Sequence, residues 1–305
     1  MCRLFFILPS PAKETIKQKR ACKKMLPLPY KNFDMKKYII FIILLFHLCY
    51  GCYRLSDGQA KSLSALPHTA AGVSSDTSLH HLEYPAYSDK ETIIEHLGYT
   101  TCFNHQTLIP DWVAYELTAE ETYGPYKRDT AFMPDPCIRG KQASSLDYRG
   151  SGYDRGHMAP AADMKWNKQA MSECFYLSNI CPQNHDLNSQ AWERVEWMGR
   201  RIAQKYGRVY IVCGPLFYSN QHNTIGFHRI AVPDAFFKAL LIPYNRSYSA
   251  IAFIMPNQTP DKHMKEYACT VDSAEAASGL DLFFQLEDEE ECEIESDIIW
   301  KHWGI

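Results

Sequence analysis

The chain has 305 residues, of which 46% are hydrophobic and 13% aromatic. These proportions are ordinary for a globular protein and exclude the disordered and collagen-like classes. The net charge of −3 is unevenly spread, because residues 1–37 carry ten basic and two acidic side chains, which leaves 22 basic and 33 acidic ones for the rest. A body with a net charge of −11 does not coat a nucleic acid by neutralising phosphates. Any action on nucleic acids therefore depends on a small local cluster of cations and a metal ion.

The N-terminal part has the pattern of an export signal. Met35 and two lysines precede a mostly apolar run at 38–50, which is shorter than the ~20 residues of a membrane-spanning helix. We therefore expect 1–53 to be an N-terminal extension and signal peptide, with the true start at Met35. The expected location is periplasmic, secreted or on the outer surface. Membrane attachment, either by a signal anchor or by a lipidated Cys52, stays open as an alternative. The Ser-, Ala- and Gly-rich residues 54–80 are expected to form a flexible linker.

Residues 81–305 alternate short apolar runs with turns, which predicts one α+β domain. Strands are expected at 112–118, 208–215, 235–242 and 249–256, because these runs are apolar or alternate in polarity and several are closed by Gly or Pro. The clearest helix is 189–207, where apolar residues recur at helical spacing until Gly207. Eight of the eleven residues at 287–297 are acidic, which predicts a solvated segment. Cys213 lies in an apolar run and is expected to be a buried free thiol.

The most informative stretch is 147–196, which contains the sequence Asp154-Arg155-Gly156-His157. It places a cation and an imidazole two residues apart. About thirty residues later, polar residues crowd the start of the predicted helix and include Asn188. Read alone, Asn188 fits a helix N-cap and a lone histidine is more often structural than catalytic, so these alternatives stay open.

The spacing along the helix favours a functional interpretation. Asn188, Trp192 and Glu196 are four residues apart, which predicts that their side chains share one side of the helix. An amide ligand at Asn188 would then have a carboxylate two turns away, near a helix N-terminus that favours phosphate oxygens. An arginine, a histidine, an amide and a carboxylate in this arrangement indicate phosphodiester hydrolysis.

The segments DRGHMAP, LSNICPQ and LNSQAWERVE closely resemble successive motifs of the DNA/RNA non-specific endonuclease family, and the resemblance covers about 82–286. It implies the ββα-metal (His-Me finger) nuclease fold, with a central antiparallel sheet flanked by helices. It also implies Mg²⁺-dependent hydrolysis of DNA and RNA, with Mn²⁺ as a substitute metal, 5′-phosphate products and a homodimer.

The resemblance also implies a role for each matching residue. His157 is the general base, Asn188 the direct protein ligand of Mg²⁺, and Glu196 the residue that orients a metal-bound water. Arg155 and Arg128 would stabilise the charged phosphate, with Asn179 as a supporting amide. Two alternatives stay open: a catalytically inactive nucleic-acid-binding lipoprotein of the same fold, and a phosphodiesterase acting on small nucleotides.

Overall fold

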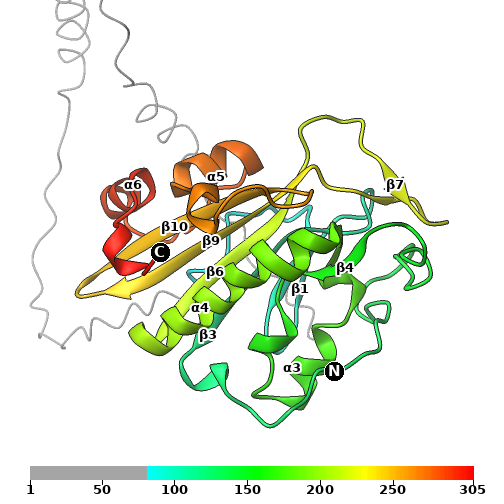
Figure 1. Ribbon diagram of the computed structural model, residues 1–305, viewed down its shortest axis with the longest axis horizontal. Helices are drawn as coiled ribbons and strands as arrows, with labels where there is room; N and C mark the ends of the chain where they lie inside the picture. The colour runs from blue at the N-terminus through cyan, green and yellow to red at the C-terminus, as the bar shows by residue number, and fades with distance from the viewer. Residues whose placement is uncertain (1–80) are drawn as a thin grey trace, which may run out of the picture. The chain divides into compact units, whose positions relative to one another are not determined.

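The computed structural model describes residues 81–305, which form a seven-stranded antiparallel sheet with helices on both faces (Figure 1). The strand order is β1-β2-β3-β6-β9-β10-β11. Their bounds are β1 Thr92–Glu95, β2 Thr100–Phe103, β3 Pro110–Thr118, β6 Arg208–Leu216, β9 Ala235–Tyr244, β10 Ser247–Pro256 and β11 Ala268–Cys269. The four strands predicted from the sequence are confirmed as β3, β6, β9 and β10. The expected signal peptide, linker and Cys52 lie outside the described residues.

Strand β9 shows how the sequence produces a sheet that is covered on both faces. Phe236 and Leu240 belong to the core on one face, whereas Phe237 and Leu241 belong to the core on the other. Successive side chains of a strand point to opposite faces, so a strand buried on both sides is apolar without a break. The one polar residue inside this strand, Lys238, is only 1% exposed.

Helix α4, Glu193–Tyr206, packs on one face of the sheet through Val195 and Ile202. Helices α5, Val271–Ser278, and α6, Asp288–Ser296, pack on the other face (Figure 1). The acidic run at 287–297 includes α6, and most of its residues are exposed, as expected of a solvated segment. Glu291 and Glu295 are only 1% and 3% exposed, because this side of the helix faces the sheet.

The remaining elements lie in the connections. A second, two-stranded sheet pairs β4, Asp154–His157, with β5, Ile180–Gln183, and a third pairs β7, Thr224–Ile225, with β8, Ile230–Ala231. The other helices are η1 Glu120–Thr122, η2 Ala161–Asp163, α3 Lys168–Glu173, η3 Leu177–Asn179, η4 Leu187–Trp192, η5 Met264–Tyr267 and η6 Trp300–His302. Within residues 81–305, every helix is too short or too polar to cross a bilayer.

Candidate active site

The hairpin of β4 and β5 carries the Asp154–His157 motif. The strands are antiparallel, with Asp154 opposite Gln183 and His157 opposite Ile180. A side chain at Gly156 would bring its Cβ within 2.6 Å of the Gln183 Cβ, so only glycine allows this close approach. Gly156 thus permits the pairing that presents Arg155 and His157 on one side of β4.

His157 is buried, at 6% exposure, among aromatic rings. The ring centroids of Phe175 and Phe132 lie 4.8 Å and 5.4 Å from its imidazole. Burial, with a smaller contribution from the Arg128 charge, lowers the pKa of His157 to about 3. Nε2 has no hydrogen-bond partner among the described residues. His157 is therefore neutral at physiological pH and able to accept a proton.

The structure brings both predicted arginines next to this histidine. Arg128 lies over the Phe175 ring, with its Cζ 5.2 Å from the centroid. Arg155 lies over the Phe132 and Tyr148 rings at 5.3 Å and 5.7 Å, and it donates a hydrogen bond of 2.8 Å to the Ser145 carbonyl. The two guanidinium groups therefore flank the aromatic pocket of His157, where they would attract a phosphate.

The helix that follows β5 begins differently from the sequence expectation. Asn184, not Asn188, is the capping residue: its Oδ1 accepts hydrogen bonds from the backbone N–H groups of Asp186 and Leu187. Asn188 instead donates through Nδ2 to Asp154 Oδ2 at 3.0 Å. The alternative of Asn188 as an N-cap is therefore excluded, because its amide is directed toward β4.

The first turns, η4, form a π-helix in place of the expected regular helix. Asn188 and Trp192 nevertheless both face β4, and Glu196 follows them in the regular helix α4. Trp192 points inward, is 1% exposed and donates from Nε1 to the His157 carbonyl at 3.2 Å. Two hydrogen bonds therefore join η4 to β4. One comes from Asn188, near the first residue of η4, and the other from Trp192, its last residue.

Glu196 is partly buried on α4, and burial raises its pKa to about 7. The Lys238 charge opposes this shift and the Asp163 charge adds to it. Asp163 forms an ion pair of 2.7 Å with Arg200, one turn after Glu196. Lys238 donates from Nζ to the Met158 carbonyl at 3.1 Å and lies 4.4 Å from the Trp192 ring centroid.

These neighbours were missed by sequence reasoning, although two signals were present. Lys238 interrupts an otherwise apolar strand, and such a lysine is seldom buried without a partner. Arg200 follows Glu196 at the helical spacing of four. Asp154 holds the Asn188 amide and also accepts a hydrogen bond from His185 Nδ1 at 2.9 Å.

Asn179 holds the backbone next to the candidate active site. It is fully buried, donates from Nδ2 to the carbonyls of Ala159 and Cys174, and accepts the Ala159 N–H at 2.9 Å. Its amide thus fixes the backbone that follows His157. Every hydrogen bond of the Asn179 side chain is to a backbone group. This indicates that Asn179 positions the backbone of the site.

The residues fit a Mg²⁺ ion at Asn188. Donation from Nδ2 to Asp154 fixes the orientation of the amide, and no hydrogen bond within residues 81–305 uses Oδ1. A carbonyl oxygen is a ligand that Mg²⁺ prefers, and Mg²⁺ commonly uses only one or two protein ligands. A group of three carboxylates, Asp272, Glu275 and Glu295, lies apart on α5 and α6.

Comparison with known proteins identifies the family. The family model for DNA/RNA non-specific endonucleases matches residues 77–289. Mitochondrial endonuclease G of Homo sapiens is 34% identical over 197 residues, which cover 60% of this chain and 66% of that protein. Mitochondrial nuclease 1 of Schizosaccharomyces pombe is 38% identical over 205 residues, or 61% of this chain and 64% of that protein. The crystal structure of the EndoG/EndoGI complex matches with a TM-score of 0.64 and 28% identity, covering 72% of this chain and 96% of the matched one.

The chain belongs to the DNA/RNA non-specific endonuclease family. This confirms the resemblance seen in the motifs and the expected α+β ββα-metal fold. The chain spans just under two thirds of the length of the curated relatives described above. The expected export is wrong: the relatives from human and from two yeasts are mitochondrial nucleases. Basic, acid-poor N-terminal residues are also typical of mitochondrial transit peptides, and this explains the error.

Proposed function

We propose that this protein is a Mg²⁺-dependent, sequence-nonspecific endonuclease that hydrolyses DNA and RNA and leaves 5′-phosphate ends. The observation that carries the proposal is the neutral, buried His157 beside two arginines, on a strand that also orients the Asn188 amide. Family membership supports the reaction class. By analogy with its relatives, the proposed location is the mitochondrion.

In this proposal His157 takes a proton from the attacking water. An imidazole that is neutral before substrate binds can accept a proton, although its low pKa makes it a weak base. A bound phosphate would offset the Arg128 charge that contributes to the low pKa, and this would raise the basicity of His157 when the substrate is in place.

The remaining residues act on the phosphate and the ion. Arg128 and Arg155 would hold the non-bridging oxygens and stabilise the charge that develops on them. Asn188 would hold Mg²⁺ through Oδ1, and Glu196 would orient a water in its hydration shell. When bound, the ion stabilises the leaving oxygen and supplies a water that can protonate it. Contacts made to phosphates and not to base edges make cleavage tolerant of sequence.

The test is a cleavage panel on plasmid DNA, single-stranded RNA and a small phosphodiester, each with Mg²⁺, with Mn²⁺ and with EDTA. We expect cleavage of both polymers with either metal and none in EDTA, and end-labelling should find 5′-phosphates. Cleavage of the small diester alone would favour a nucleotide phosphodiesterase. Light scattering on the same sample checks the predicted homodimer.

The residue assignment is tested with His157→Ala, for which we expect the cleavage rate to fall by about a hundredfold to ten-thousandfold while the fold is retained. His105→Ala is the matched control, because His105 is exposed and bonded only to Thr92 on the sheet edge. Plasmid cleavage by His157→Ala at the rate of the control would contradict the role of His157.

A further inference from the structure

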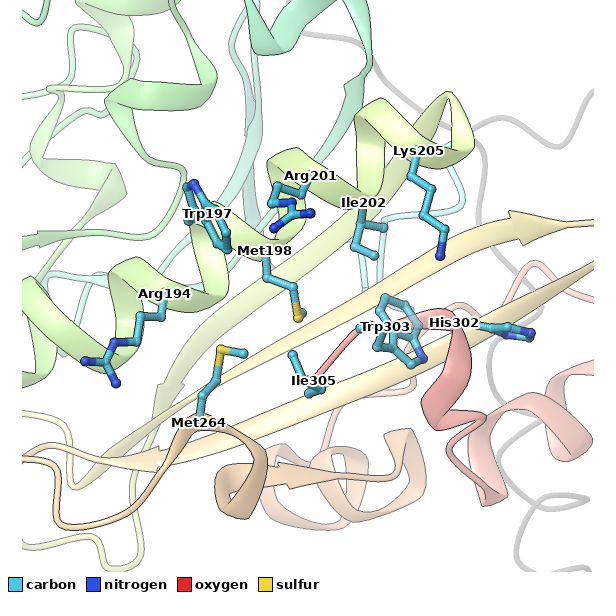
Figure 2. Close-up of a pocket in the computed structure, with 11 residues that line it drawn as sticks. Arg194, Trp197, Met198, Arg201, Ile202, Lys205, Met264, His302, Trp303 and Ile305 are labelled. Atoms are coloured by element: carbon cyan, nitrogen blue, oxygen red, sulfur yellow. The ribbon is translucent and has the colours of Figure 1, made fainter.

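A cavity of about 430 Å³ lies between α4 and the C-terminal residues (Figure 2). Met198 and Ile202 of α4 point into it, and Trp303 faces them from the other side. These three residues are only 2–4% exposed. The base of the cavity is therefore apolar, and a ligand arriving from solvent would first meet the side chains at its mouth.

The mouth is basic and aromatic. Arg194, Trp197, Arg201 and Lys205 are all exposed and belong to successive turns of α4; we call them the α4 cationic rim. Arg201 stacks over the Trp197 ring with its Cζ 4.8 Å from the centroid. Within residues 81–305, none of the three cations of the rim forms an ion pair with a carboxylate. Three uncompensated cations are notable in a body whose net charge is −11.

The rim begins beside the candidate active site but on the other flank of the helix. Arg194 follows Asn188 by six residues, which is between one and two turns of the helix. Glu196 and Arg200 face the catalytic flank, where Arg200 pairs with Asp163. Trp197 is 55% exposed and lies on the outer side of α4, between the two flanks. A nucleic-acid strand that leaves the active site would cross one helix diameter, about 10 Å, to reach the rim.

We propose that the α4 cationic rim binds a stretch of single-stranded nucleic acid outside the scissile bond, with phosphates on the cations and a base stacked on Trp197. This inference rests on the proposed nuclease function. Exposed arginine and lysine side chains neutralise phosphates, and an exposed tryptophan stacks on any base, so the surface is tolerant of sequence. An anionic lipid is the alternative occupant, and binding to phospholipid vesicles distinguishes it from a nucleic-acid strand.

The spacing of the cations suits a nucleic-acid strand. Arg194 and Arg201 are seven residues apart, about 10 Å along α4, and Arg201 and Lys205 about 6 Å. A stacked nucleic-acid strand with the B-form rise of about 3.4 Å per nucleotide would place phosphates on these cations two to three nucleotides apart. The rim thus extends the bound length by several nucleotides, which a short substrate does not use.

The test compares the full-length wild type with Arg201→Gln/Lys205→Gln and with Trp197→Ala. Fluorescence anisotropy measures binding of a labelled 20-nucleotide single-stranded DNA in EDTA, across a range of salt concentrations. We expect each variant to bind about tenfold more weakly, and the double variant to lose about 1.4 from its log–log salt slope, because two phosphate contacts are lost. Cleavage of a four-nucleotide substrate with Mg²⁺ should keep its wild-type kcat/KM. The matched control is Lys90→Gln/Arg246→Gln, which removes the same charge from exposed residues outside α4.

Binding of the 20-mer by the double variant with the affinity and slope of the control would overturn the proposal. A double variant that loses binding to anionic phospholipid vesicles but keeps binding to the 20-mer would overturn it in favour of a membrane surface. Because binding is measured without metal, it is independent of catalysis. A wild type that cleaves nothing refutes the nuclease function, whereas the anisotropy series decides the role of the rim.

Discussion

The lowered pKa of His157 predicts that this residue makes folding stability depend on pH. Above pH 6.5 the imidazole is neutral in both the folded and unfolded states, so it adds no pH dependence. As the pH falls from 6.5 toward the folded pKa of about 3, the unfolded chain binds a proton that the folded protein excludes. Stability is therefore lost in this window. At pH 5 the loss is about 2 kcal/mol, because 1.5 pH units each contribute about 1.4 kcal/mol.

The perturbation is His157→Gln, which keeps a neutral polar side chain of similar size and removes the titration. Urea unfolding in EDTA at pH 8 and pH 5, followed by circular dichroism, gives the free energy of unfolding of each protein. Wild type should lose about 2 kcal/mol more than the variant between these pH values. The other histidines, including His302 with its lowered pKa, are common to both proteins and cancel. Equal losses in the two proteins would refute the inference that His157 is neutral because it is buried.

Two further predictions concern the surroundings of the site. Gly156→Ala forces a Cβ against Gln183, so we expect a loss of about 2 kcal/mol in urea-unfolding stability, and unchanged stability would show that the hairpin tolerates a side chain there. Lys238→Met removes the charge that opposes the raised pKa of Glu196, so the acid limb of the pH–rate profile should move to higher pH. An acid limb that stays in place would mean that ionisation of Glu196 does not limit the rate.

Local sequence patterns predicted most of the sheet, because each central strand is an apolar run that only burial explains. The motif of the hairpin and the order of the site residues could also be predicted from the sequence, because all of these residues lie within about seventy positions of one another. The π-helix could not be predicted from the sequence. Its hydrogen bonds join residues five apart, and a segment of six residues is too short to show that period in its sequence. The capping role went to Asn184 and not to Asn188, since both residue types suit a cap and only the fold distinguishes them.

The contacts that orient the site join residues far apart in the chain, and sequence spacing does not reveal them. Asp154 is 34 residues from Asn188, and Lys238 is 80 residues from Met158. Burial of Lys238 was unexpected because a charged residue in a strand normally indicates an exposed position. In this fold the lysine instead donates to the backbone beside His157, so a feature of the core becomes part of the electrostatics of the site.

The Asp154–Asn188 hydrogen bond makes a last prediction about metal binding. Its carboxylate holds Nδ2, so that Oδ1 is presented in one orientation, and partners of this kind typically change metal affinity by about 10- to 100-fold. In Asp154→Leu the amide is free to rotate, and the Mg²⁺ concentration for half-maximal cleavage should rise by about that factor, with much smaller loss of rate at saturating metal. Asp154→Asn keeps an acceptor for Nδ2 and should recover most of the affinity. Equal half-maximal Mg²⁺ concentrations for Asp154→Leu and wild type would contradict the assignment of Asn188 as the ligand. If Oδ1 of Asn188 bound the ion, freeing its amide to rotate would weaken metal binding.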